Sequence, residues 1–390
     1  MIYILAFIVL IGVIVFVHEL GHYIAARSVG VGVERFSIGM PPNFIDLTKT
    51  KSGLILDIYF FSFSNSKIKW KKIYSTTFKS FTKPSETIFT VGLLPLGGYV
   101  KMKGILDESM DSEFAGAEDE LESKTPLQKI WVMSAGVIMN IILTFFVFSL
   151  IGGIQGEMIT ENDDAVIDYV VPGGPADQNN LMDGDKIISI NDFKIDGWSE
   201  AVSIIEKYPS QNISMDIMRD DKIINKNISL TSRPNLDSGR VDQQVGALGV
   251  SKKQISKKLN FVESLSYGVD ETKWAMVLMT SSLKMIFQGN VSRDDVGSVI
   301  MIGDMAGQAA QAGLIPFLFL MALISVNLAY INILPIPGLD GGHIAIIMIE
   351  VLMGRSLSVK ARIRIQSIGM FILFSLMIFL LLNDIIRVFS

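Results

Sequence analysis

The sequence predicts a polytopic α-helical membrane protein with four transmembrane helices and one inserted, β-rich soluble domain. Hydrophobic residues make up 49% of the 390 residues, charged residues only 19%, and the mean hydropathy is +0.43. These values are typical of a membrane protein. The apolar residues form four separate blocks, each about the 20 residues that a helix needs to cross a bilayer. Between the second and third blocks, short runs of alternating apolar and polar residues indicate strands instead.

We expect the transmembrane helices at residues 1–24, 130–153, 315–343 and 363–386. A cleaved signal peptide is the alternative for the first block. Its start, Met1-Ile2-Tyr3, carries no positive charge, and no A-x-A cleavage site precedes the polar sequence. The first block is therefore predicted to stay as a membrane helix.

The segments between the helices differ in character. Residues 25–129 are predicted to form a cytoplasmic loop with strands or hairpins at Leu54–Phe63 and Phe89–Met102, and the acid-rich run at 107–122 reads as a solvated linker. In residues 157–232, Gly, Pro, Asn and Asp separate short apolar runs, which predicts a small folded domain. Residues 233–312 are predicted to hold a linker and amphipathic helices.

The positions of Lys and Arg predict the orientation in the membrane. The loop at 25–129 is rich in lysine, and the loop before the fourth helix carries Arg355, Lys360, Arg362 and Arg364. By the positive-inside rule both loops are cytoplasmic, so both termini and the domain at 157–232 face outward. The net charge of −5 gives no reason to expect nucleic acid. The absence of cysteine from the sequence excludes disulfides and thiolate metal sites.

The first helix carries an H-E-x-x-H motif, His18-Glu19-Leu20-Gly21-His22. The i, i+4 spacing places both imidazoles on one face, where they can bind one metal ion. Zinc suits them because it accepts histidine nitrogen and keeps an open position for water when the protein supplies three ligands. Glu19 is placed to act as general base on that water. A chance match is the alternative, but two of the three histidines fill the motif, and a glutamate at membrane depth is costly unless function requires it.

A third ligand is expected from the polar cluster between Asn327 and His343. Pro335 and Pro337 must break the third helix there, which hydrocarbon tolerates only where the freed backbone groups line a cavity. Asp340 follows at once and can supply a carboxylate oxygen to zinc. A solvated aspartate at a capped helix end is the alternative. His343 is an alternative ligand, for which we favour a role beside the ligands instead.

These motifs resemble the site-2 protease family of intramembrane zinc metalloproteases, and within it the bacterial regulators of sigma-E protease. The resemblance runs nearly end to end, and H-E-x-x-H followed by N-x-x-P-x-P-x-L-D-G-G is highly specific. The matching segments are V-H-E-L-G-H-Y at 17–23, F-S-I-G at 36–39, P-L-G-G-Y-V-K-M at 95–102, S-V-N-L at 325–328 and N-I-L-P-I-P-G-L-D-G-G-H at 332–343.

The resemblance implies residue roles. His18, His22 and Asp340 would bind one Zn²⁺ per chain, with Glu19 as the base. A membrane-re-entrant β-hairpin around residues 95–103 would bind an unwound substrate as an added strand. The implied substrate-binding residues are Asn332, Pro335, Gly97, Gly98, Tyr99, Val100 and Met102. An ordinary cytoplasmic hairpin is the alternative for this segment.

The outer domain resembles a circularly permuted bacterial PDZ domain through Val171–Ala176 and Gly184–Asn191. The chain departs from the family pattern in three ways. It has room for one PDZ-like domain where enterobacterial relatives carry two, and its first loop is longer between Ile45 and Phe89. In the second helix, Val137 stands where the family's G-P-x-x-N motif has proline, between Gly136 and Asn140.

The predicted function is therefore an intramembrane zinc endopeptidase of the bacterial cytoplasmic (inner) membrane, with its active site towards the cytoplasmic side. By resemblance, its substrates are single-pass membrane proteins, such as an anti-sigma factor or remnant signal peptides, already cut outside the membrane by a site-1 protease. A catalytically silent PDZ scaffold and a metal or ion transporter are the rival interpretations. A zinc assay separates the first rival from a protease, and a flux measurement in proteoliposomes separates the second.

Overall fold

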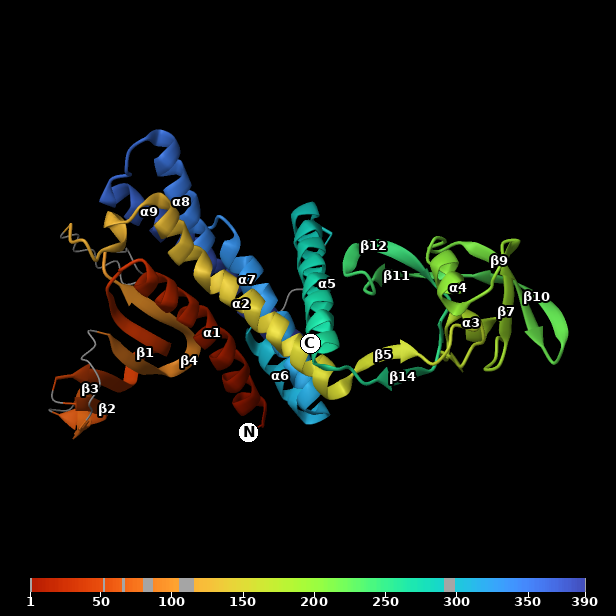
Figure 1. Ribbon diagram of the computed structural model, residues 1–390, viewed down its shortest axis with the longest axis horizontal. Coiled ribbons are helices and arrows are strands. Elements are labelled where there is room, and N and C mark those ends of the chain that lie inside the picture. Colours follow the sequence, from red (N-terminus) through yellow and green to blue (C-terminus); the bar gives the residue numbers. More distant parts are fainter. Residues whose placement is uncertain are drawn as a thin grey trace. The chain divides into compact units, whose positions relative to one another are not determined.

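The computed structural model describes residues 2–51, 53–64, 67–79, 87–104, 116–290 and 299–389. Most of the predicted linker at 107–122 lies outside these ranges. The chain forms two compact units, residues 1–147 with 292–390 and residues 148–291. Figure 1 labels the helices and strands of both units.

Four helices in the described part of the chain are long and apolar enough to cross a membrane. They are α1 (Ile2–Ser28), α2 (Pro126–Gln155), α7 (Leu314–Ile333) and α9 (Val359–Phe389). Their positions agree with the four predicted blocks. The start of α2 is capped: the backbone N–H of Thr125 donates a hydrogen bond to Oε1 of Gln128 at 3.0 Å, and Pro126 is the first residue of the helix.

The third predicted helix, at 315–343, is interrupted where Pro335 and Pro337 were predicted to break it. α7 ends at Ile333, and a second helix, α8 (Asp340–Met353), begins after six intervening residues. The break contains Pro335 and Pro337, which cannot donate backbone hydrogen bonds. Asp340 therefore lies at the start of a helix. A further short helix, α6 (Val299–Ala312), precedes α7 and packs against α1.

The predicted strands of the first loop belong to one sheet. It contains β1 (Val33–Thr50), β2 (Gly53–Ser64), β3 (Lys67–Phe78) and β4 (Ile88–Met102), in the order β3-β2-β1-β4. Residues 35–38 of β1 lie between two parts of β4. They pair with residues 98–101 on one side and with residues 88–91 on the other, so both strands bend midway. The predicted hairpin segment is thus at the end of β4, beside the first half of β1. We call Gly97–Met102 the outer part of β4.

This sheet packs its apolar side onto α1. Phe36 of β1 and Val100 of β4 are buried in a cluster with Ala25 and Ala26 of α1, and the ring of Phe36 contacts that of Tyr23 edge to face. Gly98 permits the close approach, because a Cβ there would lie 2.8 Å from Val15 Cγ1 and 3.2 Å from Glu19 Cγ. The outer part of β4 is held beside Glu19 as a result.

The second unit contains an α+β domain whose strand pairs are antiparallel. Its central sheet has the order β10-β9-β7-β8, and its core contains the fully buried Ile187, Ile213 and Ile217. The domain was predicted to end at residue 232, but Leu248 belongs to the core and β13 pairs with β6, so the fold extends to Ser251. The elements are β5 (Glu157–Thr160), β6 (Tyr169–Val170), α3 (Pro175–Gln178), β7 (Lys186–Ile190), β8 (Phe193–Lys194), α4 (Trp198–Ile205), β9 (Asn212–Arg219), β10 (Lys222–Ser229), β11 (Thr231–Asn235), β12 (Arg240–Ala247), β13 (Val250–Ser251), β14 (Gln254–Lys257) and α5 (Phe261–Gln288).

Candidate metal centre

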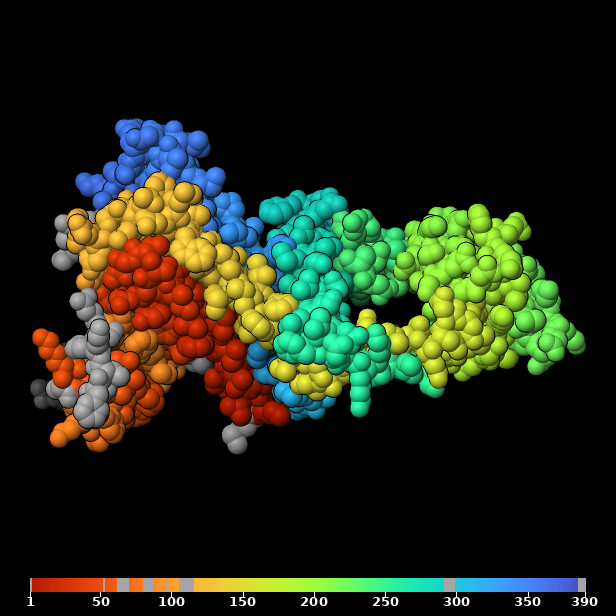
Figure 2. All heavy atoms as spheres, viewed as in Figure 1, coloured from red at the N-terminus to blue at the C-terminus, as the bar shows by residue number. Residues whose placement is uncertain are grey.

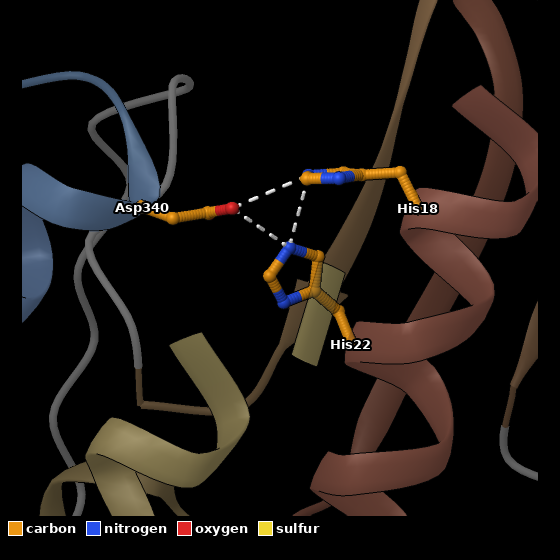
Figure 3. A group of neighbouring side chains, drawn as sticks. All are labelled: His18, His22 and Asp340. Carbon is orange, nitrogen blue, oxygen red and sulfur yellow. Dashed lines mark hydrogen bonds and ion pairs between the residues drawn. The ribbon is translucent and has the colours of Figure 1, made fainter. Parts of the chain in front are cut away.

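Three predicted ligands meet in the first unit. His18 and His22, one turn apart on α1, direct their rings at Asp340 at the start of α8 (Figure 3). The Oδ2 atom of Asp340 lies 3.3 Å from the Nε2 atom of each histidine. The two Nε2 atoms are 3.2 Å apart. The break after α7 thus brings a carboxylate onto the helix face that carries both imidazoles.

The chemistry of these three groups fits a metal ion. The two histidines are buried, and Asp340 Oδ2 is a buried oxygen without a hydrogen-bond partner among the described residues. A buried carboxylate oxygen without a hydrogen-bond partner is costly unless a cation compensates its charge. The three ligand atoms lie within 4.8 Å of one another, and two imidazoles with one carboxylate form a donor set that zinc accepts.

Helix α2 supplies the other wall of this site. The Nδ1 atom of His22 lies 2.8 Å from the carbonyl oxygen of Val132. Because that oxygen can only accept, Nδ1 carries the proton and the lone pair is left on Nε2, the atom that faces Asp340. The backbone of Gly136 comes so close that a Cβ there would lie 2.4 Å from His22 Nε2 and 2.7 Å from His18 Nε2. Figure 2 shows the atoms of α1 (red) and α2 (yellow) in contact.

The three ligands open into a cavity of about 710 Å³. Glu19, the predicted base, lines it beside the histidines, and so do Asn332 and His343. His343 lies outside the ligand group itself. The predicted hairpin residues that line the cavity are Gly97, Gly98, Tyr99, Val100 and Met102.

The two remaining predicted substrate-binding residues, Asn332 and Pro335, differ in whether they reach the ligands. The Nδ2 atom of Asn332 lies 3.2 Å from His18 Nε2, so this amide reaches the ligand triangle. Pro335 is exposed and is not part of the cavity wall. Its position in the break between α7 and α8 indicates that it shapes the chain before Asp340.

Sequence reasoning missed the part that α2 plays. In the sequence, Gly136 and Asn140 stand out only through the departure of their motif from the family pattern, which predicts no contact of either residue with the histidines. Asn140 Nδ2 lies 3.3 Å from His18 Nδ1, and its side chain is completely buried. An asparagine four residues after a glycine, in the middle of an apolar helix, is the pattern that could have located them.

Comparison with known proteins decides the family. The model of peptidase family M50 matches residues 6–63 and 59–376. The chain belongs to peptidase family M50. This family comprises the site-2 proteases, so the chain is a metalloprotease of the site-2 type and a membrane protein.

Several relatives resemble this M50 peptidase over nearly its full length. A Campylobacter jejuni protein named as a zinc metalloprotease is 31% identical, covering 98% of this chain and 93% of its own. Zinc metalloprotease RasP of Bacillus licheniformis is 27% identical, covering 99% of both chains. A solved PDZ domain of an SdrC-like protein from Listeria monocytogenes covers 24% of this chain and 92% of its own, with 18% identity and a TM-score of 0.20.

Proposed function

We propose that this M50 peptidase is an intramembrane zinc endopeptidase in which His18, His22 and Asp340 hold one metal ion and Glu19 is the general base. The observation that carries the proposal is the convergence of three acceptor atoms, one of them the unpartnered Oδ2 of Asp340, on one wall of a large cavity. Zinc bound there would make a water molecule more acidic and polarise the scissile carbonyl.

The residues around the ligands have separate tasks. Glu19 takes a proton from the attacking water and returns it to the leaving amine. Asn332, whose amide reaches the ligand triangle, donates a hydrogen bond to the substrate carbonyl. His343, on the cavity wall, remains beside the ligands.

The strand beside the site supports a class of substrate. A transmembrane helix hides its carbonyls in its own hydrogen bonds, so it must unwind before water can attack. The outer part of β4, Gly97–Met102, lines the cavity and can pair with the unwound backbone by β-augmentation. We propose that it enters the membrane as a re-entrant segment and that the substrates are single-pass proteins, such as an anti-sigma factor or remnant signal peptides, first cut by a site-1 protease.

The charge pattern supports an orientation. Lysines are abundant in the loop between α1 and α2, and arginines precede α9, which supports a cytoplasmic position for both loops. The second unit, proposed to be a PDZ-like domain, then lies outside the cytoplasmic membrane, with the active site nearer the cytoplasmic side.

The experiment that tests this function combines metal content with cleavage. His22→Ala should lose both zinc and cleavage of a single-pass substrate, since it removes a ligand. Glu19→Gln should keep zinc but lower the cleavage rate about 100- to 10,000-fold, the usual contribution of a general base. Cleavage by Glu19→Gln at the rate of the unaltered enzyme would exclude the mechanism.

A further inference from the structure

Asn140 is a buried polar side chain in the middle of α2 that the proposed chemistry does not use. Its exposure is 0%, and it lies within one of the most apolar helices of the chain. A polar residue in such a segment costs free energy, so its presence calls for a partner. The neighbour is His18, whose Nδ1 atom lies 3.3 Å from the amide nitrogen of Asn140.

The side-chain amide has two orientations, which exchange Oδ1 and Nδ2 by a half turn. In one, Nδ2 donates to Nδ1 of His18, and Oδ1 has no hydrogen-bond partner among the described residues. The imidazole proton must then sit on Nε2, which faces Asp340. In the other, Oδ1 accepts the Nδ1 proton, and the Nε2 lone pair is free for a metal ion.

We propose that Asn140 is a positioning residue that accepts the Nδ1 proton of His18 and thereby fixes the tautomer that offers Nε2 to the metal. The arrangement repeats that of His22, whose Nδ1 faces the carbonyl oxygen of Val132 at 2.8 Å. Val132, Gly136 and Asn140 follow one another at intervals of four residues, so they lie on one face of α2. That face offers one acceptor to each histidine, with the glycine between them.

A second observation explains how Asn140 keeps its position. Its backbone carbonyl accepts hydrogen bonds from Ser325 Oγ at 2.9 Å and from Thr144 Oγ1 at 3.0 Å. Thr144 Oγ1 also lies 3.2 Å from the carbonyl oxygen of Ala322. Ser325 belongs to the S-V-N-L segment of α7, so hydrogen bonds between α2 and α7 hold the amide against His18.

The inference rests on the proposed zinc site, and the test measures zinc binding as well as cleavage. Asn140→Leu has nearly the same shape but no acceptor, whereas Asn140→Asp keeps an acceptor for the Nδ1 proton. We expect Asn140→Leu to bind zinc about 10- to 100-fold more weakly, as is usual when an outer hydrogen-bond partner of a metal ligand is lost. Asn140→Asp should bind zinc within a few-fold of the unaltered protein.

Nitrogen NMR of histidine-labelled, zinc-loaded protein gives a second measurement. The loss of a residue with a merely structural role would not change it. The chain has three histidines, so the signals are few. The Nδ1 proton of His18 should be protected from solvent exchange in the unaltered protein and in Asn140→Asp, and should exchange faster in Asn140→Leu. Thr272→Val is the matched control, because it removes a buried hydroxyl from a helix of the second unit, α5, and touches none of the groups that hold Asn140.

The outcomes separate the two proposals. If Asn140→Leu binds zinc as tightly as the unaltered protein while His22→Ala loses it, the tautomer role is wrong and the zinc site stands. If His22→Ala retains zinc, the proposed site itself is wrong. Should Asn140→Leu fail to fold, Asn140→Asp decides alone, since weakened zinc binding together with fast exchange of the His18 Nδ1 proton would overturn the acceptor role.

Discussion

The interiors of the two units are built on different principles. In the second unit, the buried carboxylate of Asp185 is paired with Arg219 at 2.6 Å, and the surrounding core is apolar. In the first unit, the buried side chains of His18, His22 and Asn140 gather with Asp340, which has an oxygen without a hydrogen-bond partner. One interior satisfies its own polar groups, and the other needs a cation. The interior of the first unit should therefore be far less tolerant of small changes in side-chain shape.

The largest effect expected from this comparison is that of Gly136→Ala. The added methyl group would lie 2.4 Å from His22 Nε2, so either a ligand or α2 must move. Since a displacement of about 1 Å at a reacting centre can cost 100-fold in rate, we expect at least that loss of cleavage, together with loss of zinc. Measuring zinc content and cleavage of the purified variant checks this.

Gly12→Ala is the control for that substitution. It is also a glycine in a membrane-spanning helix, but no atom lies within 4 Å of the added methyl group. It should bind zinc and cleave substrate normally. Equal losses in the two variants would mean that any added methyl group disturbs the helices, and the special fit of Gly136 would be refuted.

The second largest effect on cleavage is expected from a proline in β4, the strand beside the site. The backbone N–H of Lys103 bonds to Gly32 next to β1, so alternation along β4 directs the N–H groups of Val100 and Met102 away from β1. Val100→Pro then removes a donor available to substrate without breaking the pairing with β1. We expect slower cleavage of every substrate with zinc content unchanged.

Val100→Ala is the matched control, because it trims the same buried side chain and keeps the N–H group. If Val100→Ala slows cleavage as much as Val100→Pro, packing against α1 accounts for the effect. The proposed pairing with substrate would then lose its support.

A third prediction treats the second unit as dispensable for the chemistry. All residues that line the cavity belong to the first unit. Because β5 pairs with β14 through Thr160 and Gln254, residues 161–253 can be replaced by a short Gly/Ser turn. If the domain selects substrates by size, the shortened protein should cleave untrimmed as well as trimmed substrates. Continued resistance of untrimmed substrates would contradict a size filter.

Much of the site was predictable because local spacing sets it. The i, i+4 histidines must share a helix face, and the two prolines must break the helix before Asp340. The contribution of α2 was not predictable in this way, since the contacts of Gly136 and Asn140 with the histidines depend on how two helices pack. The hydrogen bond between Asn140 and His18 joins residues 122 positions apart in the sequence.

The fold was predictable to a similar depth. Apolar blocks located the four long helices, whereas the separate helix α8 was hidden in an apolar sequence that continues past the break. The strands of the first loop were expected, but not the double register of residues 35–38, which long-range pairing determines. The end of the second unit was placed too early because the pairing of Val250 with Val170 also joins distant residues.

The smallest effect should come from the core of the second unit. Ile217 is completely buried on β9, opposite Ile187 of β7. Ile217→Val removes one methylene group, which typically lowers the free energy of unfolding by about 0.5–1.5 kcal/mol. Faster hydrogen exchange of the β9 amides would report it. Ile223→Val, at a side chain that is 69% exposed on the neighbouring strand, should leave exchange unchanged.

Zinc affinity should stay constant in both variants, since the domain core has no ligand to position. A loss of zinc affinity in Ile217→Val comparable with that of Gly136→Ala would show that the two interiors are coupled and that the contrast between them is wrong.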